Sequence, residues 1–244
     1  MPLPQQPLKA IFPIVRVIHE ASIAAYRFLG TGFYIDNGGT FLTAKHVFPN
    51  AESTKEHIYN AITFDSQNSQ PFPLPISDLV FSPQFDIALG RVQGASDIQP
   101  LDVATENPPI NFDIVTAEFS RTHIERMQNE KLSLTFVTCY RKGHIIRYYG
   151  STYPESIPTQ CLELSFPALK GASGAPVLLE LSGAVIGMIV QNIGHELLPA
   201  QIETITESEN YTEEIKYYLP SGKAISWVHL TEFVNSVPKQ LKKN

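Results

Sequence analysis

Short runs of Val, Ile, Leu, Phe and Tyr recur along the chain, separated by Gly, Pro, Asn and Asp. This pattern predicts many short strands rather than long helices. The turn residues Asp36-Asn37-Gly38-Gly39 favour a hairpin between two of these runs. The predicted strands lie at 12–17, 24–28, 32–35, 41–43, 58–64, 87–92, 114–119, 132–140, 145–149, 160–164, 177–181 and 184–190. We therefore expect an all-β protein, either a barrel or a sandwich.

The pattern changes at three places. Near Leu101–Ile110, two consecutive prolines remove ladder donors and predict a boundary between β-rich halves at 1–105 and 106–244. The tail from Trp227 to Leu241 has apolar residues at helical spacing and predicts a short closing helix, interrupted at its proline. The Glu-rich stretch 191–219 predicts either a long loop or a poorly specified helix.

Composition and charge narrow the function classes. The chain has 244 residues, of which 43% are hydrophobic and 17% charged, so it can bury a sizeable core. A net charge of −6 offers no basic field for a nucleic-acid backbone, and we expect no nucleic-acid partner. The longest apolar runs, such as 183–190, are too short to span a bilayer, so we expect no membrane partner.

The two cysteines, Cys139 and Cys161, cannot form a disulfide framework or complete a Cys-rich zinc site. Histidines and carboxylates show no metal-ligand spacing, and nothing implies a metal or cofactor. The N-terminus has prolines where a secretory signal would have a charged start and a continuous apolar core. These features predict a cytoplasmic protein.

The segment Gly171-Ala172-Ser173-Gly174 carries the sharpest chemical signal. Glycines on both sides of the serine predict a tight turn from which the hydroxyl can project, while the N–H groups of Gly171 and Ser173 converge. Such a pair of donors can stabilise the oxyanion of an acyl-transfer transition state. A plain Gly-Pro turn between two strands is the alternative for this segment alone.

A serine hydroxyl becomes a strong nucleophile only when a neighbouring base, such as an imidazole, takes its proton. A carboxylate must in turn hold that imidazole in the correct orientation. Of the histidines, His46 stands at a strand-to-turn junction, in Thr43-Ala44-Lys45-His46-Val47. Asp86 precedes an apolar run that predicts a buried strand, which would anchor its carboxylate. Asp78 is the competing carboxylate, and we prefer Asp86 because a strand follows it directly.

His46 in TAKHV, Asp86 in DIAL and Ser173 in GASGAPV, in that order, resemble the trypsin-like serine proteases of the chymotrypsin fold. The likeness is greatest to the high-temperature-requirement type and related bacterial trypsin-like peptidase domains. GTGFYID before the histidine, SGAVIGMIV after the serine and KAISWV opening a C-terminal helix extend the resemblance over roughly residues 28–235.

The resemblance implies two six-stranded antiparallel β-barrels with a short C-terminal helix and a triad in the cleft between them. It implies that His46 is the general base, that Asp86 orients it and that Ser173 is the nucleophile. The N–H groups of Gly171 and Ser173 would form the oxyanion hole. The resemblance therefore implies a serine endopeptidase that acts on protein or peptide substrates through an acyl-enzyme.

Departures from the family pattern refine this expectation. Secreted digestive members have Asp before the nucleophile, which pairs with a new N-terminus; this chain has Ala172, so activation by that ion pair is not available. The resemblance implies that the pocket for the residue before the scissile bond is lined by uncharged residues, which predicts a small or medium apolar preference. These lining residues are Pro167, Ala168, Val190, Gln191 and Asn192.

Two other functions remain open on the sequence. One is a protease-fold binding module without catalysis, although all three triad identities are present. The other is a latent enzyme that needs a partner or ligand, such as a regulatory protein, to order its oxyanion loop. The Glu-rich stretch 191–219 near the expected cleft is the feature that suggests it, although a solvated surface loop is the commoner explanation for such a run of charges.

Overall fold

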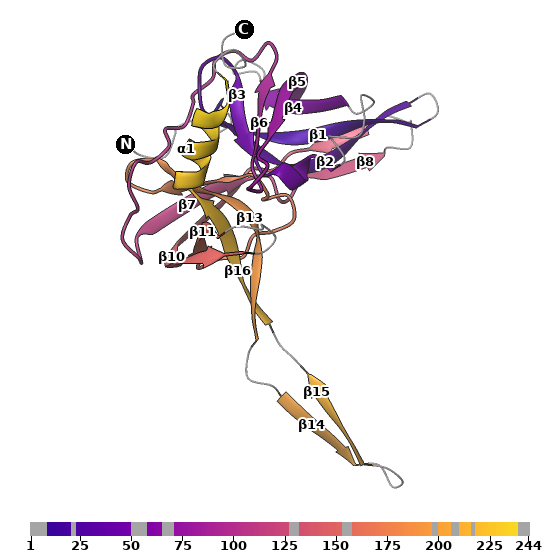
Figure 1. The fold of residues 1–244 in the computed structure, drawn as a ribbon. Coiled ribbons are helices and arrows are strands. Elements are labelled where there is room, and N and C mark those ends of the chain that lie inside the picture. The colour runs from indigo at the N-terminus through magenta and orange to yellow at the C-terminus, as the bar shows by residue number, and fades with distance from the viewer. Residues whose placement is uncertain are drawn as a thin grey trace.

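The fold consists of two closed, six-stranded antiparallel barrels and a C-terminal helix (Figure 1). This confirms the fold class expected from the sequence. The computed structural model describes residues 9–20, 23–49, 58–64, 71–126, 132–152, 158–196, 200–205, 210–215 and 218–238. The proline-containing N-terminal residues 1–8 lie outside the described residues.

The first barrel closes in the strand order β1-β2-β3-β6-β5-β4. Its interior is aromatic: the centroid of the Phe12 ring lies 4.6 Å from that of Tyr34 and 5.3 Å from that of Phe41, and all three side chains are buried. Phe12 pairs with Gly32 and Phe41 pairs with Tyr34, so these rings share one face of the sheet. Phe33, also fully buried, lies on the other face. The bounds are β1 (Ile11–Glu20), β2 (Ile23–Tyr34), β3 (Thr40–Thr43), β4 (Ile58–Phe64), β5 (Pro71–Phe81) and β6 (Ala88–Val92).

Two strands of this barrel differ from the sequence prediction. β2 joins the two strands predicted at 24–28 and 32–35 into one, with an irregularity in its pairing to β1. β5 was not predicted, because Pro71, Pro73 and Pro75 argue against a strand. Because the three prolines occupy every second position, the backbone nitrogens that lack a hydrogen all lie on one side of the strand. The pairing of β5 with β4 is kept.

The second barrel closes in the order β10-β11-β16-β13-β12-β7. Its interior is aliphatic, with Leu162, Leu164, Ile186 and Ile189 among its buried residues. The single strand predicted at 132–140 is wrong, because the chain leaves one strand and begins another within it. The barrel strands are β7 (Asp113–Glu118), β10 (Cys139–Ser151), β11 (Thr159–Leu164), β12 (Pro176–Leu179), β13 (Val185–Glu196) and β16 (Tyr218–Ser226). β8 (His123–Arg126) and β9 (Leu132–Thr135) pair with each other in a separate two-stranded sheet.

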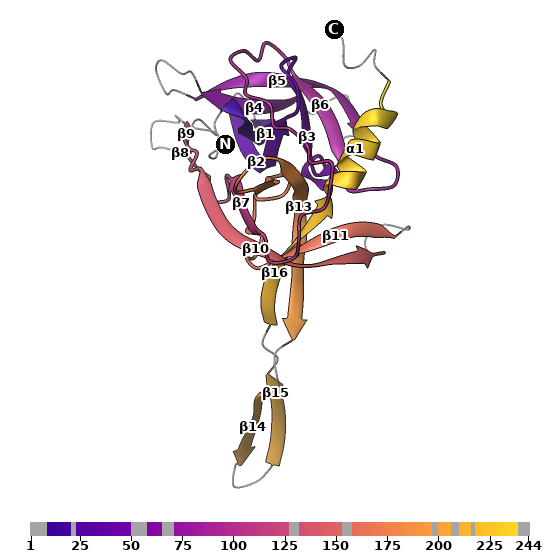
Figure 2. The ribbon, with the colours of Figure 1, turned by 90° about the vertical axis from the view of Figure 1, so that its left-hand side faces the viewer.

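In its described residues, the Glu-rich stretch 191–219 forms strands, so the expectation of a long loop or a helix is wrong there. β13 and β16 run on together past the barrel as far as the pair Glu196 and Tyr218. β14 (Ala200–Ile205) and β15 (Asn210–Ile215) then form a separate two-stranded sheet. Figures 1 and 2 show this arm projecting from the second barrel, away from the first. Because this arm projects beyond the barrel, packing in the barrel core does not require the apolar alternation by which a strand is predicted.

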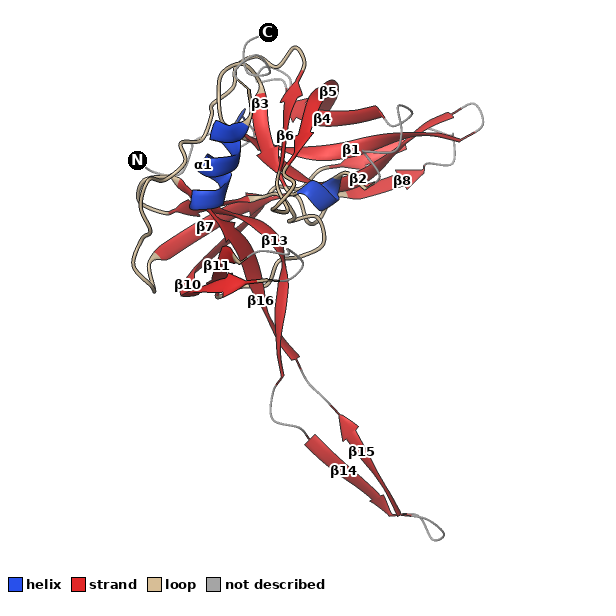
Figure 3. Cartoon of the chain, in the orientation of Figure 1, coloured by secondary structure: helices blue, strands red, loops and turns tan. Residues whose placement is uncertain are grey.

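The closing helix is α1 (Trp227–Ser236), drawn in blue in Figure 3, as is the short 3-10 turn η2 (Lys45–Val47). The expectation that KAISWV opens the helix is wrong for its first residues, because Lys223–Ser226 end β16 and the helix begins at Trp227. Leu230 and Phe233 anchor α1 in the apolar core.

Candidate active site

His46 lies on η2, directly after β3, and contacts two side chains that are distant in the sequence. Its Nε2 is 2.8 Å from the Ser173 hydroxyl, and its Nδ1 is 2.6 Å from Asp86 Oδ2. The backbone N–H of His46 also donates to Asp86 Oδ1, at 3.0 Å. The carboxylate thus holds the ring and its backbone together, leaving Nε2 directed at the serine. This arrangement can take a proton from the hydroxyl and hold the resulting imidazolium.

Asp86 is fixed by the segment around it. Its neighbour Phe85 stacks on the His229 ring of α1, with 4.2 Å between ring centroids, and donates its N–H to Ser82 Oγ. Asp86 itself has a side chain only 16% exposed. The C-terminal helix therefore supports the turn that carries the carboxylate.

The structure brings Asp86, and not Asp78, to His46. Asp78 lies within β5 at a φ of 53°, where its carboxylate accepts a hydrogen bond from Ser77. The sequence argument that a following strand anchors Asp86 agrees with this placement.

The loop before β12 carries Ser173 between two glycines with positive φ, Gly171 at 96° and Gly174 at 85°. A Cβ at position 174 would lie 2.1 Å from the Thr31 carbonyl oxygen, so only glycine fits there. Within the described residues, the N–H groups of Gly171 and Ser173 donate to no protein acceptor. These two donors are therefore free to bind an oxygen beside Ser173.

Ala172 packs where a carboxylate would stand in the secreted members. Its methyl group is 1% exposed and belongs to the aliphatic interior of the second barrel. The side chain has no polar atom that could hold the loop through an ion pair. Ala172 instead contributes its N–H, which donates to Leu169 at 2.9 Å and closes a tight turn.

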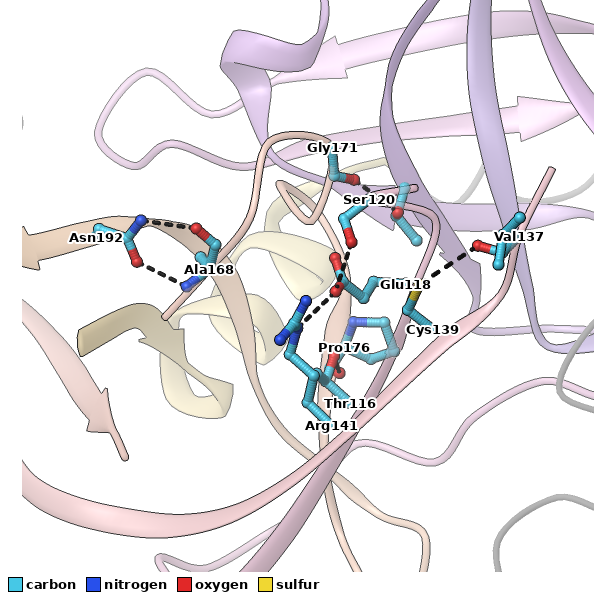
Figure 4. Close-up of polar contacts among 11 residues, drawn as sticks. Thr116, Glu118, Ser120, Val137, Cys139, Arg141, Ala168, Gly171, Pro176 and Asn192 are labelled. Atoms are coloured by element: carbon cyan, nitrogen blue, oxygen red, sulfur yellow. Dashed lines mark hydrogen bonds and ion pairs between the residues drawn. The ribbon is translucent and has the colours of Figure 1, made fainter. Parts of the chain in front are cut away.

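The residues expected to line a specificity pocket fall into two groups. Asn192 and Ala168 are tied by a reciprocal pair of bonds: the Ala168 N–H donates to Asn192 Oδ1, and Asn192 Nδ2 donates to the Ala168 carbonyl, both at 2.6 Å (Figure 4). Pro167 and Gln191 are half-buried neighbours of this pair. Val190 is 5% exposed and packs in the apolar core.

Sequence reasoning missed a buried carboxylate near the nucleophile loop. Glu118, at the end of β7, is fully buried, and its Oε1 accepts from Arg141 Nε at 2.8 Å and from Ser120 Oγ at 2.9 Å (Figure 4). Ser120 in turn lies against Gly171. A charged residue inside an apolar strand run, Val115 to Phe119, was the signal that could have revealed it.

A second buried carboxylate, Glu163 on β11, lies on the face opposite Leu162 and Leu164. Arg147 contacts its Oε2 at 2.6 Å, while His195 at 2.5 Å and Ser221 at 2.8 Å contact its Oε1. Burial raises the pKa of Glu163, but the hydrogen bonds from the three partners outweigh it and hold the pKa below the ordinary 4.5. This carboxylate stays ionised at neutral pH.

Other kinds of site find no support in the described part of the chain. No group of three or more His, Cys, Asp or Glu side chains there is arranged to hold a metal ion. None of the helices in that part is long and apolar enough to cross a membrane.

A double barrel with a Ser-His-Asp constellation contributed by both halves defines the class of trypsin-like peptidases. The family model for the trypsin-like peptidase domain matches residues 30–188. The chain belongs to this family, which confirms the resemblance drawn from the sequence. No curated protein matches the chain by sequence.

Solved structures share the fold at low identity. The active form of the Rv3671c protease from M. tuberculosis is 14% identical with a TM-score of 0.57, over 97% of this chain and 88% of that one. Deg5 is 15% identical with a TM-score of 0.58, over 97% and 91%. The HtrA-type protease AlgW, solved with a decapeptide, is 13% identical with a TM-score of 0.60, and the match covers 94% of this chain but only 64% of AlgW.

Proposed function

We propose that the protein is a serine endopeptidase that cleaves protein or peptide substrates through an acyl-enzyme. The observation that carries the proposal is the position of His46, which contacts Ser173 through one ring nitrogen and Asp86 through the other. An imidazole held in this way can accept the hydroxyl proton at Nε2 while Nδ1–H stays bonded to the carboxylate.

In the proposed reaction, Ser173 Oγ attacks the scissile carbonyl carbon and His46 Nε2 takes its proton. The carbonyl oxygen becomes an oxyanion, bound by the N–H groups of Gly171 and Ser173. His46 then returns the proton to the leaving amine, and the acyl group remains on Ser173. Water, deprotonated by His46, releases the second product and regenerates the hydroxyl.

The preferred residue before the scissile bond would be small or medium and apolar. Pro167, Ala168, Val190, Gln191 and Asn192 include no carboxylate that could bind a Lys or Arg side chain. The bonds between Asn192 and Ala168 also tie the two proposed pocket walls together, which favours a narrow site. A peptide library with Ala, Val, Leu, Phe, Lys and Glu at this position tests the preference, and cleavage fastest after Lys would contradict it.

Labelling by a fluorophosphonate probe tests the nucleophile. We expect the wild-type protein to label and Ser173→Ala to remain unlabelled. Ser221→Ala is the matched control, because Ser221 also contacts a histidine but through a different arrangement, and it should label like the wild type.

A folded wild-type protein that does not label would contradict the proposal. It would favour the binding module or the latent enzyme that needs a regulatory partner. Labelling that survives in Ser173→Ala would mean that another residue is the nucleophile.

A further inference from the structure

Thr31, in the last part of β2, reaches from the first barrel to the loop that carries Ser173. Its hydroxyl donates to the Gly171 carbonyl at 3.0 Å, and its backbone N–H donates to the Ser173 carbonyl at 2.9 Å. Thr31 is fully buried, so water cannot replace the hydroxyl. One residue thus binds the carbonyls of both proposed oxyanion donors.

Little else in the loop could set the direction of the Gly171 peptide. Ala172 is an apolar side chain in the barrel interior, and glycine at 171 has wide backbone freedom. Packing limits only the position of its Cα: a Cβ built there would lie 2.3 Å from the Phe28 ring and 3.4 Å from Ser120 Cα. The plane of the peptide between Gly171 and Ala172 is set by hydrogen bonds at its two ends.

These two bonds are the one from Thr31 to the Gly171 carbonyl and the one from the Ala172 N–H to Leu169. The Ala172 bond closes a turn over 169–172 in which Gly171 has the positive φ, 96°, that the third residue of a type II turn requires. The Gly171 N–H belongs to the central peptide of this turn, and a flip of that peptide requires φ of Gly171 to become negative. The bond from Thr31 opposes the accompanying movement of the Gly171 carbonyl, and without this bond the flip becomes easier. The preceding peptide then turns its Lys170 carbonyl, in place of the Gly171 N–H, toward Ser173.

We propose that Thr31 is a positioning residue for the oxyanion hole: its hydroxyl holds the Gly171 carbonyl so that the Gly171 N–H faces the developing oxyanion. This inference rests on the proposed serine endopeptidase activity. It also means that the first barrel, besides carrying His46 and Asp86, shapes the oxyanion-binding part of the second.

The test compares Thr31→Val, which removes the hydroxyl at nearly constant volume, with Thr31→Ser, which keeps it. Rates on a peptide substrate are divided by the concentration of titrated active sites, so that loss of folded protein does not count. We expect Thr31→Val to lower kcat by about 10- to 100-fold with little change in KM, because the bond supports transition-state stabilisation. Thr31→Ser should restore most of the rate.

Binding of a peptide aldehyde gives a second measurement. The aldehyde forms a tetrahedral adduct whose oxygen occupies the oxyanion hole, so its affinity should fall in parallel with kcat/KM in Thr31→Val. A peptide product, which carries no tetrahedral oxygen, should bind with unchanged affinity.

Thr116→Val is the matched control. Thr116 is also fully buried, and its hydroxyl donates at 2.8 Å to the Pro176 carbonyl, on the same segment but beyond the nucleophile turn (Figure 4). It should lower the melting temperature about as much as Thr31→Val while leaving kcat unchanged. Should Thr31→Val not fold, Thr31→Ala takes its place in the comparison.

Two outcomes would overturn the inference, and they differ. A wild-type enzyme that cleaves in a Ser173-dependent way, with the same kcat in Thr31→Val and Thr116→Val, overturns the role of Thr31 alone. A folded wild-type protein without Ser173-dependent labelling overturns the proposed activity and the role of Thr31 with it.

Discussion

His46 and His195 each contact a serine hydroxyl and a carboxylate, one where the two barrels meet and the other in the second barrel. His46 uses both ring nitrogens, Nδ1 for Asp86 and Nε2 for Ser173. Among the described residues, His195 makes both contacts through Nε2, which lies 2.5 Å from Glu163 Oε1 and 3.1 Å from Ser221 Oγ. The residue types are nearly the same, but only the first imidazole lies between its two partners.

The arrangement decides what the hydroxyl can do. Ser221 donates directly to Glu163 at 2.8 Å, so its proton is already committed to the carboxylate. His195 Nε2 contacts the same carboxylate oxygen, so this imidazole is not placed to take the proton from the Ser221 hydroxyl. In the other group no bond joins Ser173 to Asp86 among the described contacts, and the imidazole is the only route between them. Composition alone therefore does not define a catalytic site.

The largest expected effect separates the two serines. Ser173→Ala should lower kcat by about 10⁴- to 10⁶-fold, because it removes the proposed nucleophile while leaving the fold intact. Ser221→Ala should leave kcat unchanged and cost about 1 kcal/mol in the free energy of unfolding, the value of one buried hydrogen bond. Steady-state rates and urea unfolding of both variants measure these effects. Equal losses of activity would contradict the distinction between the two groups.

The carboxylates should differ next. Asp86→Asn keeps the size of the side chain but favours the wrong tautomer of His46, and we expect kcat to fall by about 10⁴-fold. Asp78→Asn provides the control, since Asp78 bonds Ser77 and not the imidazole. If Asp78→Asn were the more harmful change, the assignment of Asp86 would be wrong.

The sequence predicted much of this site because its signals are local. Gly171 and Gly174 flank Ser173 directly, and the strand that anchors Asp86 follows it at once. Apolar runs in the same way predicted an all-β protein, either a barrel or a sandwich, and the expectation of two barrels came from the family resemblance. Contacts between distant segments gave no such signal: Thr31 and Gly171 are 140 residues apart, and neither is unusual where it stands.

The missed strands have a different cause. β5 contains three prolines, and β14 and β15 extend beyond the barrel, where no core imposes an apolar face. β16 was missed because Lys223 and Ser221 interrupt its apolar character, although both are buried in the structure. Their partners come from other strands, and the local sequence does not contain them.

A smaller effect is expected at Glu163, on stability rather than activity. The pKa of this carboxyl is lower in the folded protein than its ordinary value of 4.5. Such a group stabilises the fold above its unfolded pKa, and the stabilisation is lost as the pH falls through the lowered folded pKa. Glu163→Gln should cost about 1–3 kcal/mol at neutral pH, because buried donors lose a charged acceptor.

The measurement is the midpoint of urea unfolding between pH 7 and pH 3. The stability of Glu163→Gln should fall less steeply on the acid side than that of the wild type, and kcat should be unchanged. A variant whose stability keeps the full wild-type dependence on pH would show that Glu163 does not contribute to it.

The smallest effect is expected at Arg147, which shares Glu163 with His195 and Ser221. The Arg147 side chain is 53% exposed, so water screens its charge. When the guanidinium is removed, Glu163 still has contacts from His195 and Ser221. Arg147→Gln should therefore cost less than about 1 kcal/mol, and less still in high salt. Urea unfolding at low and high salt measures the difference. A loss as large as that of Glu163→Gln would mean that the guanidinium, rather than the buried hydroxyl and imidazole, supports the carboxylate.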